Sequence, residues 1–344
     1  MPRVNSFPIL LLAAASLIAT LTIPTAATAR KPPEIKHFQY FRSGSPQDLA
    51  TTARTGFALM GGGKDLDEAF RWMCNRSGGG DFLVLRATGD DAYNPYIQSL
   101  CRQNSVATLV VPSREAAKDP FVAKTIAHAE AIFIAGGDQA NYIRFWMGTP
   151  VQAEINKAIQ RGVPVGGTSA GLAVMGEWAY SAEGDKPDEP NLDGKTALAD
   201  PLGPRVTLVP GFLDIPLLKD TITDSHFVKR DRMGRLLAFL AQIQNSRRDL
   251  NVRGLGIDER TAVLLDSDGK AAVVGRGAVY LVRPSPAVAE IVPGKPLDNA
   301  KFEIQKVDSG RSFDLSRWCC GSTTYTLMVE DGGLRAGKDA QPVY

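Results

Sequence analysis

The chain has 344 residues, of which 44% are hydrophobic and 22% are charged. These proportions are typical of a globular protein and exclude a disordered or collagen-like chain. The formal net charge of +2 gives no support to a nucleic-acid partner, because nucleic-acid-binding proteins usually carry a strong basic excess. The length fits one large domain with additions, or two domains.

The first 29 residues have the pattern of a secretory signal peptide. Arg3 precedes an apolar stretch at 8–23, and Ala27 and Ala29 form an A-x-A cleavage pattern. The alternative is a membrane anchor, but the stretch is short for a span of about 20 residues. We therefore expect cleavage after Ala29 and a secreted or periplasmic protein with no membrane attachment.

Short apolar runs alternate with segments of helical spacing from residue 56 to residue 180. Strands are predicted in GFALMGGG, DFLVLRATG, VATLVVP, AIFIAGGD and VPVGGTSAG. Helices are predicted in DLDEAFRWMCNRS, NPYIQSLCRQN, DPFVAKTIAHAE, QANYIRFWMG, VQAEINKAIQRG and LAVMGEWAY. This alternation predicts an α/β fold with a mostly parallel sheet and helices on both faces. Several strands end in glycine-rich turns, at the sheet edge where such folds bind ligands.

The flanking and C-terminal parts differ in composition. Residues 30–55 are polar and contain proline, which indicates an N-terminal lead-in. Residues 182–205 are rich in proline, glycine and aspartate, which predicts a surface loop or flap. A helix is predicted at 231–244, and DSDGK is predicted as a hairpin turn within 254–283. Residues 284–344 are proline-rich and then strand-like, which predicts a C-terminal β-rich extension.

Four cysteines are present, and none has zinc-ligand spacing. Cys74 and Cys101 lie on neighbouring helix-like segments, so they could pair in an exported protein. The adjacent Cys319 and Cys320 are not expected to bridge each other, because such a bridge is strained. Buried thiols or one structural disulfide are the favoured interpretation.

Residues 167–171, GTSAG, have the G-x-S-x-G form of a nucleophile turn between a strand and a helix. Such a turn exposes the serine and presents backbone N–H groups to the oxyanion that forms when the serine attacks. The alternative is a glycine-rich turn for a phosphate. The chain has no lysine in Walker position and no G-x-G-x-x-G here. Ser169 is therefore the candidate nucleophile.

A serine nucleophile needs a base, and the chain has three histidines. His37 lies in the polar lead-in and His128 lies on a helix-like segment, so both are expected at the surface. His226 directly follows a strand-like run and is the best base by elimination. The alternative for His226 is a structural role in capping the next helix.

A carboxylate should orient the imidazole. Asp258 and Glu259 end an apolar run, and strand alternation lets only one of them face the site. Asp224 is a further option. The residues alone leave this choice open.

The motifs GGTSAG, AGGDQ, DSHFVKRDRMGRL and GIDERTA, in this order, resemble the cyanophycinase group of the S51 serine peptidase family, which also includes aspartyl dipeptidases. The resemblance covers about residues 56–283, the expected catalytic domain. It implies a class I glutamine amidotransferase-like, flavodoxin-like fold. Such folds often dimerise, so a homodimer is compatible with the resemblance.

The resemblance also implies roles for single residues. Ser169 would be the nucleophile, His226 the base and Glu259 the orienting acid. Backbone N–H groups at Gly137 and Ala170 would form the oxyanion hole. The residues implied in substrate binding are Gln139, Asp224, Arg230, Arg232 and Arg235. Neither a metal nor an organic cofactor is implied.

The expected reaction is hydrolysis of aspartyl peptide bonds in cyanophycin, arginine-substituted polyaspartate, with release of β-Asp-Arg dipeptides. The alternatives are an aspartyl or isoaspartyl dipeptidase and a non-catalytic binding protein of the same fold. The chain departs from the cyanophycin-degrading pattern at Ser225, where a glutamine is expected, and in the 182–205 loop. GDDAYNPYIQSLC also resembles a subgroup signature. These departures leave the substrate open.

Overall fold

A computed structural model describes residues 37–344 except for 187, 249–250, 287, 289, 322 and 337–341. The expected signal peptide and the first residues of the lead-in therefore lie outside the described residues. Among the helices of the described part, none combines the length and the apolar character needed to cross a bilayer.

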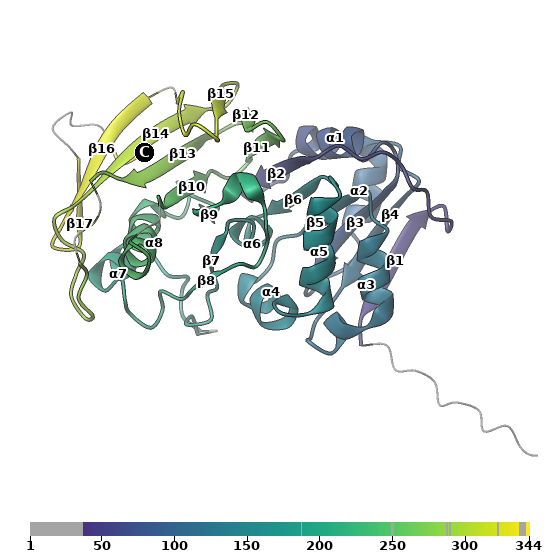
Figure 1. Cartoon of the computed structure of the whole chain (residues 1–344), viewed down its shortest axis with the longest axis horizontal. Coiled ribbons are helices and arrows are strands. Elements are labelled where there is room, and N and C mark those ends of the chain that lie inside the picture. Colours follow the sequence, from purple (N-terminus) through teal and green to yellow (C-terminus); the bar gives the residue numbers. More distant parts are fainter. Residues whose placement is uncertain are drawn as a thin grey trace, which may run out of the picture. The chain divides into compact units, whose positions relative to one another are not determined.

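The first sheet has a parallel centre between antiparallel edges (Figure 1). Its strands, in spatial order, are β1 (Gln39–Gly44), β4 (Ser105–Val110), β3 (Asp81–Arg86), β5 (Ala131–Ile134), β6 (Val165–Thr168), β2 (Gly56–Met60), β11 (Thr261–Asp266), β12 (Lys270–Gly275) and β15 (Ser312–Asp314). Strands β4, β3, β5, β6 and β2 run parallel, whereas the outer pairs are antiparallel. The mostly parallel sheet that we expected is the centre of this sheet.

Helices cover both faces of the parallel centre because its strands are apolar on both faces. In β2, Phe57 and Leu59 enter one core while Ala58 and Met60 enter the other. The helices are α1 (Asp67–Arg76), α2 (Tyr93–Leu100), α3 (Pro120–Ala127), α4 (Gln139–Trp146), α5 (Pro150–Gln160), α6 (Ala170–Ala173), α7 (Gly194–Ala199) and α8 (Met233–Ser246), with 3-10 turns at Ala116–Lys118 and Pro216–Leu218. Helices α1 and α2 pack on one face, and α3 and α5 on the other.

A second sheet, which the sequence pattern did not separate from the first, lies beside it (Figure 1). Its strands, in spatial order, are β17 (Gly333–Ala336), β16 (Thr323–Glu330), β14 (Ala300–Asp308), β13 (Ala278–Pro284), β10 (Arg253–Ile257), β9 (Thr221–Asp224), β7 (Trp178–Tyr180) and β8 (Leu208–Pro210). In β13, Tyr280 and Val282 join the core with α8, and Val279 and Leu281 join the core of the first sheet. The two sheets therefore share a core.

The predicted helix at 172–180 is wrong, because α6 ends after one turn and β7 follows. A Cβ on Gly176 would lie 2.6 Å from the carbonyl oxygen of Thr221, so the chain passes too close to β9 for a helix to continue. The predicted loop at 182–205 contains α7, which packs on α8, and Leu192 and Leu198 of this segment are buried in the same core.

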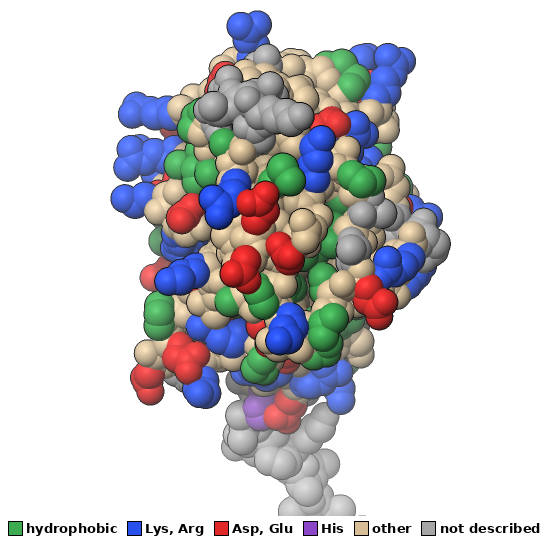
Figure 2. Space-filling view, turned by 90° about the vertical axis from the view of Figure 1, so that its left-hand side faces the viewer, with side chains coloured by type: hydrophobic (Ala, Val, Ile, Leu, Met, Phe, Trp, Pro, Cys, Tyr) green, Lys and Arg blue, Asp and Glu red, His purple; other side chains and the backbone are tan. Residues whose placement is uncertain are grey.

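The lead-in and the extension are both part of the sheets. Strand β1 of the lead-in pairs with β4 over its whole length. Strands β14, β16 and β17 continue the second sheet from β13, and β15 joins the first sheet. The β-rich character expected after residue 284 is observed, but these strands complete the two sheets. Figure 2 views the molecule from the second-sheet side, where acidic and basic side chains are interspersed.

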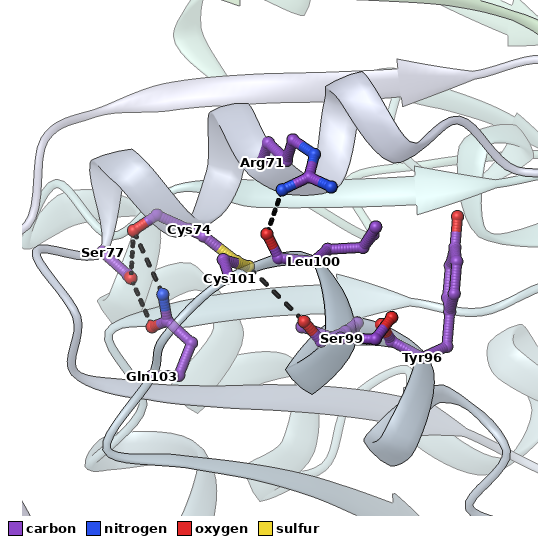
Figure 3. The surroundings of a disulfide bond; sticks show 9 residues. Arg71, Cys74, Ser77, Tyr96, Ser99, Leu100, Cys101 and Gln103 are labelled. Atoms are coloured by element: carbon purple, nitrogen blue, oxygen red, sulfur yellow. Dashed lines mark hydrogen bonds between the residues drawn. A yellow bond between two sulfur atoms is a disulfide. The ribbon is translucent and has the colours of Figure 1, made fainter.

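All four cysteines form disulfides. Cys74 on α1 bridges Cys101 just after α2, with the two Cα atoms 6.4 Å apart (Figure 3). The expectation that Cys319 and Cys320 do not bridge is wrong. The backbone turns tightly around this bridge, with positive φ angles of 52° at Trp318 and 79° at Cys320.

Removal of the first bridge tests its contribution to stability. The Cys74→Ala/Cys101→Ala variant should lose about 2–4 kcal/mol of unfolding free energy, because the bridge closes a loop of 27 residues in the unfolded chain. Denaturant unfolding measures the loss. The matched control is Cys319→Ala/Cys320→Ala. The bridge that it removes joins adjacent residues and closes no comparable loop, so this variant should lose far less unfolding free energy. Equal losses for the two variants would contradict this account.

Candidate active site

The site lies where the carboxyl ends of strands from the two sheets meet. Strands β2 and β6 of the first sheet end at Met60 and Thr168, one residue before Gly61 and Ser169. Strands β9 and β10 of the second sheet end near His226 and Glu259. The backbone N–H of His226 donates to the carbonyl oxygen of Gly61 over 2.7 Å, which ties the two sheets together at this point. Parallel strands deliver their carboxyl ends to one edge, so residues far apart in sequence converge here.

Ser169 stands on a strained turn between β6 and α6. Its φ of 55° and ψ of −113° lie outside the regions that non-glycine residues prefer. A Cβ on Gly167 would lie 2.7 Å from the backbone of Gly171, so the glycines of GTSAG allow the chain to fold back on itself. This is the geometry of a nucleophile turn, which lifts the hydroxyl out of the backbone. Because α6 has four residues, its dipole contributes little to the site.

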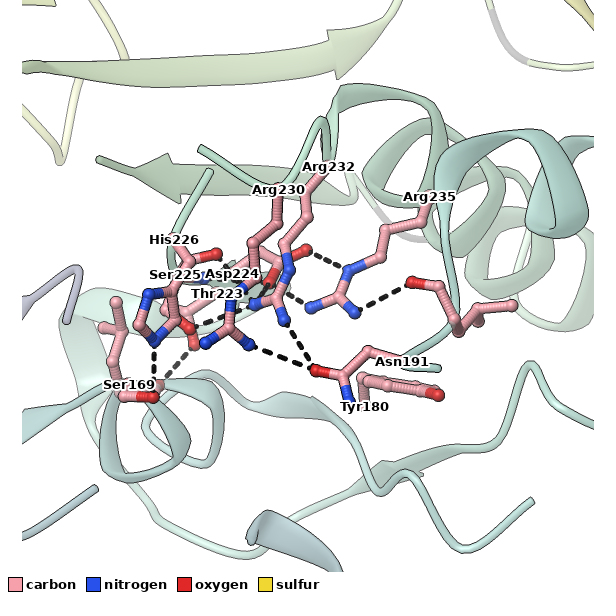
Figure 4. Close-up of polar contacts among 12 residues, drawn as sticks. Ser169, Tyr180, Asn191, Thr223, Asp224, Ser225, His226, Arg230, Arg232 and Arg235 are labelled. Carbon is pink, nitrogen blue, oxygen red and sulfur yellow. Dashed lines mark hydrogen bonds and ion pairs between the residues drawn. The ribbon is translucent and has the colours of Figure 1, made fainter. Parts of the chain in front are cut away.

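Ser169, His226 and Glu259 form a continuous hydrogen-bonded line. The Ser169 Oγ lies 2.7 Å from His226 Nε2, and His226 Nδ1 lies 2.6 Å from Glu259 Oε1. Figure 4 shows the imidazole pointing at the serine hydroxyl. The carboxylate fixes the imidazole as an Nδ1–H donor, which leaves Nε2 free to accept the serine proton.

The other two carboxylates considered for this position have different partners. Asp258 accepts from the backbone N–H groups of Val228 and Ala278, both at 3.0 Å, and so holds the loop that follows His226. Asp224 is buried and accepts from two arginines. Alternation after β10 thus directs Glu259 to the imidazole and Asp258 away from it.

Glycines after β2 leave room for the imidazole and its carboxylate. A Cβ on Gly62, whose φ is +92°, would lie 2.6 Å from the His226 ring. A Cβ on Gly63 would lie 3.2 Å from the Glu259 side chain. The sequence showed this glycine run at a strand end but gave no sign of which side chain it accommodates.

Burial is the main influence on the protonation of His226. It lowers the pKa of His226 below its ordinary value, the hydrogen bond that His226 donates to Glu259 opposes this, and Arg230 and Arg232 lower the pKa further. The hydrogen bond to His226 lowers the pKa of Glu259. At neutral pH the site therefore pairs a neutral imidazole with a carboxylate, as a general base requires.

A cavity of about 390 Å³ opens beside Ser169. Gly137, Gln139 and Ala170 line it, as the implied oxyanion and substrate roles require. Its basic side chains are Arg144, Lys186, Arg230, Arg232 and Arg235, and its acidic side chains are Asp138, Asp185 and Glu189. The cavity is therefore strongly polar, with both signs of charge on its walls.

Asp224 does not line this cavity but supports its wall. Asp224 and Arg235 are each 2% exposed, and Arg235 donates to both carboxylate oxygens of Asp224. Burial alone would raise the pKa of Asp224, but Arg235 and Arg232 outweigh it and hold the pKa below its usual range. Burial, with Arg235 beside it, lowers the pKa of Arg232 to about 9, so the Arg232 guanidinium stays charged at neutral pH.

Two site contacts were not predicted from the sequence. Asn191, in the 182–205 segment, accepts from Arg230 at 3.1 Å and from Arg232 at 3.3 Å (Figure 4). Asp65 accepts from the hydroxyl of Thr168 at 2.6 Å, next to the nucleophile. Asn191 lies in a polar stretch typical of surface loops, and only the position of Asp65 just after GGGK pointed to the site.

The strained serine, its imidazole and its carboxylate define a serine-type hydrolase. Residues 64–273 match peptidase family S51, and the chain belongs to this serine-type peptidase family. A cyanophycinase from Synechococcus elongatus is 27% identical over 255 residues, covering 71% of this chain and 73% of that protein. One from Trichormus variabilis is 31% identical over 183 residues, covering 52% of this chain and 54% of that protein.

A solved structure of similar fold is a peptidase from an acI-B1 Actinobacterium, with a TM-score of 0.50 and 19% sequence identity. The match covers 76% of this chain and 98% of that chain. It supports the mixed α/β fold with its two sheets.

The pH dependence of serine labelling tests the imidazole. Labelling of Ser169 by a fluorophosphonate should rise through an apparent pKa below 6.5 and stay level above it, because burial lowers the pKa of His226. Glu259→Gln should cut the plateau rate by about 10² or more. It should also shift the rising limb to lower pH, because the carboxylate raises the imidazole pKa. The control Glu154→Gln should match wild type, and an unchanged profile in Glu259→Gln would overturn the assignment.

Gly62→Ala tests the space for the imidazole. The added Cβ should displace the His226 ring and slow fluorophosphonate labelling by roughly 10-fold or more, since a 1 Å misplacement can cost about 10² in rate. Gly211→Ala is the matched control, because its φ of +75° carries a similar backbone strain with no atom within 4 Å of the added Cβ. Equal labelling rates in the two folded variants would show that the His226 ring keeps its position when a Cβ is added at residue 62.

Proposed function

We propose that this protein is an exported peptidase that hydrolyses aspartyl peptide bonds in cyanophycin and releases β-Asp-Arg dipeptides. The observation that carries the substrate class is the excess of buried positive charge beside Ser169. Arg232 and Arg235 are 5% and 2% exposed and share one buried carboxylate, Asp224. A buried excess of positive charge is stabilised by an anionic guest, and guanidinium groups match carboxylates in geometry.

The reaction begins with attack of the Ser169 oxygen on the substrate carbonyl carbon, while His226 Nε2 takes the serine proton. Backbone N–H groups at Gly137 and Ala170 stabilise the oxyanion. The C–N bond then breaks, and His226 gives its proton to the leaving amine. A water attacks the resulting ester, passes a proton to His226 and releases the acid, and the proton returns to Ser169.

The substrate meets both signs of charge in the cavity. A free carboxylate of the aspartyl residue pairs with Arg230 and Arg232, after displacing the oxygen of Asn191. The arginine side chain of the substrate faces Asp185 and Glu189, where it competes with Arg205, which pairs with both carboxylates. The cyanophycinases that this chain resembles support this assignment, with 27% identity over 255 residues in one of them.

Both cysteine bridges are compatible with export, since disulfides persist in oxidising compartments.

A peptidase for short aspartyl peptides is the second candidate. It is favoured by Ser225, which stands beside the arginines where the resemblance predicts a glutamine. The Ser225 hydroxyl lies 3.2 Å from the Arg232 guanidinium, so the smaller side chain changes how the cavity meets its substrate.

Two substrates and one variant separate these candidates. Purified protein beginning at residue 30 is offered insoluble cyanophycin and, separately, Asp-Xaa and isoaspartyl dipeptides. We expect soluble β-Asp-Arg from cyanophycin, measured by release of free amines, and no release by Ser169→Ala. Hydrolysis of the dipeptides alone would establish the second candidate. Fluorophosphonate labelling without hydrolysis of either substrate would overturn the proposed substrate class, and absence of both would leave a binding protein.

A further inference from the structure

The loop that carries the base and the cavity arginines is built from tight, strained turns. His226 and Asp231 both have a φ of 47°. Within the loop, the N–H of Arg230 donates to His226, and the N–H of Arg232 donates to Phe227. Non-glycine residues keep such angles only where surrounding contacts hold them. The neighbours of this loop therefore decide where its arginines lie.

Tyr344 supplies such contacts from the far end of the chain. Its hydroxyl donates to Asp231 Oδ1 over 2.7 Å and accepts from the N–H of Met233 over 2.9 Å. These two residues flank Arg232 in sequence, so one hydroxyl holds the side chain of the residue before that arginine and the backbone of the residue after it. Burial raises the pKa of Tyr344, so the hydroxyl keeps the proton that it donates.

The same contact caps a helix. Met233 is the first residue of α8, and Arg232 at the N-cap provides no side-chain hydrogen bond. The first N–H groups of a helix have no partner within it, so they need an acceptor from elsewhere. The Tyr344 hydroxyl is that acceptor for Met233, in the role that a capping side chain normally fills.

Packing holds the ring and the backbone of this segment. The Tyr344 ring packs edge-on against Phe227 and Tyr280, with centroids 6.0 and 5.8 Å away. The hydroxyl of Tyr325, on β16, donates to the carbonyl oxygen of Val343 over 2.7 Å. The segment is thus fixed to the second sheet by strands beyond the family match, which ends at residue 273.

We infer that Tyr344 is a positioning residue for the active site, which sets the backbone around Arg232 and so places the cavity arginines for an anionic substrate. The Ser169–His226–Glu259 line is held separately, by Gly61 and by its own hydrogen bonds. Loss of the tyrosine hydroxyl should therefore weaken substrate binding and leave the reactivity of Ser169 unchanged.

Tyr344→Phe tests this inference because it removes only the hydroxyl. We expect KM for the acidic substrate to rise about 3- to 10-fold, kcat and the fluorophosphonate labelling rate to stay within about 2-fold, and Tyr344→Ala to be more severe. Tyr96→Phe is the matched control, since its hydroxyl makes a comparable 2.6 Å bond to Asp67 at an exposed position. Asp231→Ala should give a similar rise in KM, and the double variant should be no worse than either single variant. KM values equal to those of Tyr96→Phe would overturn the inference.

The kinetic readout rests on the proposed function, so a second readout is independent of it. Hydrogen exchange at the Met233 amide should speed up at least 10-fold in Tyr344→Phe and stay unchanged in Tyr96→Phe. If wild type hydrolyses no aspartyl substrate, the proposed function fails, and exchange at Met233 still decides the role of Tyr344. Unchanged exchange at the Met233 amide would show that Tyr344 does not hold the loop, whether or not the protein is active.

Discussion

The active site depends on one close approach between the two sheets, the 2.7 Å hydrogen bond from the N–H of His226 to the carbonyl oxygen of Gly61. It brings a strand end of the second sheet over a strand end of the first. The imidazole then occupies the space that a side chain at Gly62 would fill. Because this contact is made by backbone atoms, any sequence that keeps the glycine at position 62 and the two strand ends preserves the contact.

Much of the catalytic line could be predicted from the sequence because its signals are local. GTSAG marks a turn by its glycines, and His226 follows a strand with few competing histidines. The residues alone did not decide between Asp258 and Glu259, because that choice depends on how β10 is oriented toward β9, and only the family resemblance pointed to Glu259. The division into two sheets was also out of reach, since strands such as β7 and β9 are three and four residues long and pair with distant partners.

The electrostatics of the cavity arise from an excess of positive charge on side chains that are buried from water. Arg232 and Arg235 share Asp224 in the interior, and Asn191 supplies an uncharged oxygen at the cavity mouth. Burying ions is costly unless each is paired, so this arrangement is weak evidence for stability and agrees with the anionic substrate that we propose. Asp224 holds the two guanidinium groups in place, so it supports the wall behind the site.

The backbone conformation of Ser169 has a consequence for the evolution of this protein. With φ at 55° and ψ at −113°, the turn carries a steric cost on the order of 1–3 kcal/mol that glycine would not bear. A drift to glycine at this position would make the folded chain easier to maintain while abolishing its chemistry. Sequences with that replacement would mark lineages in which selection for hydrolysis has lapsed.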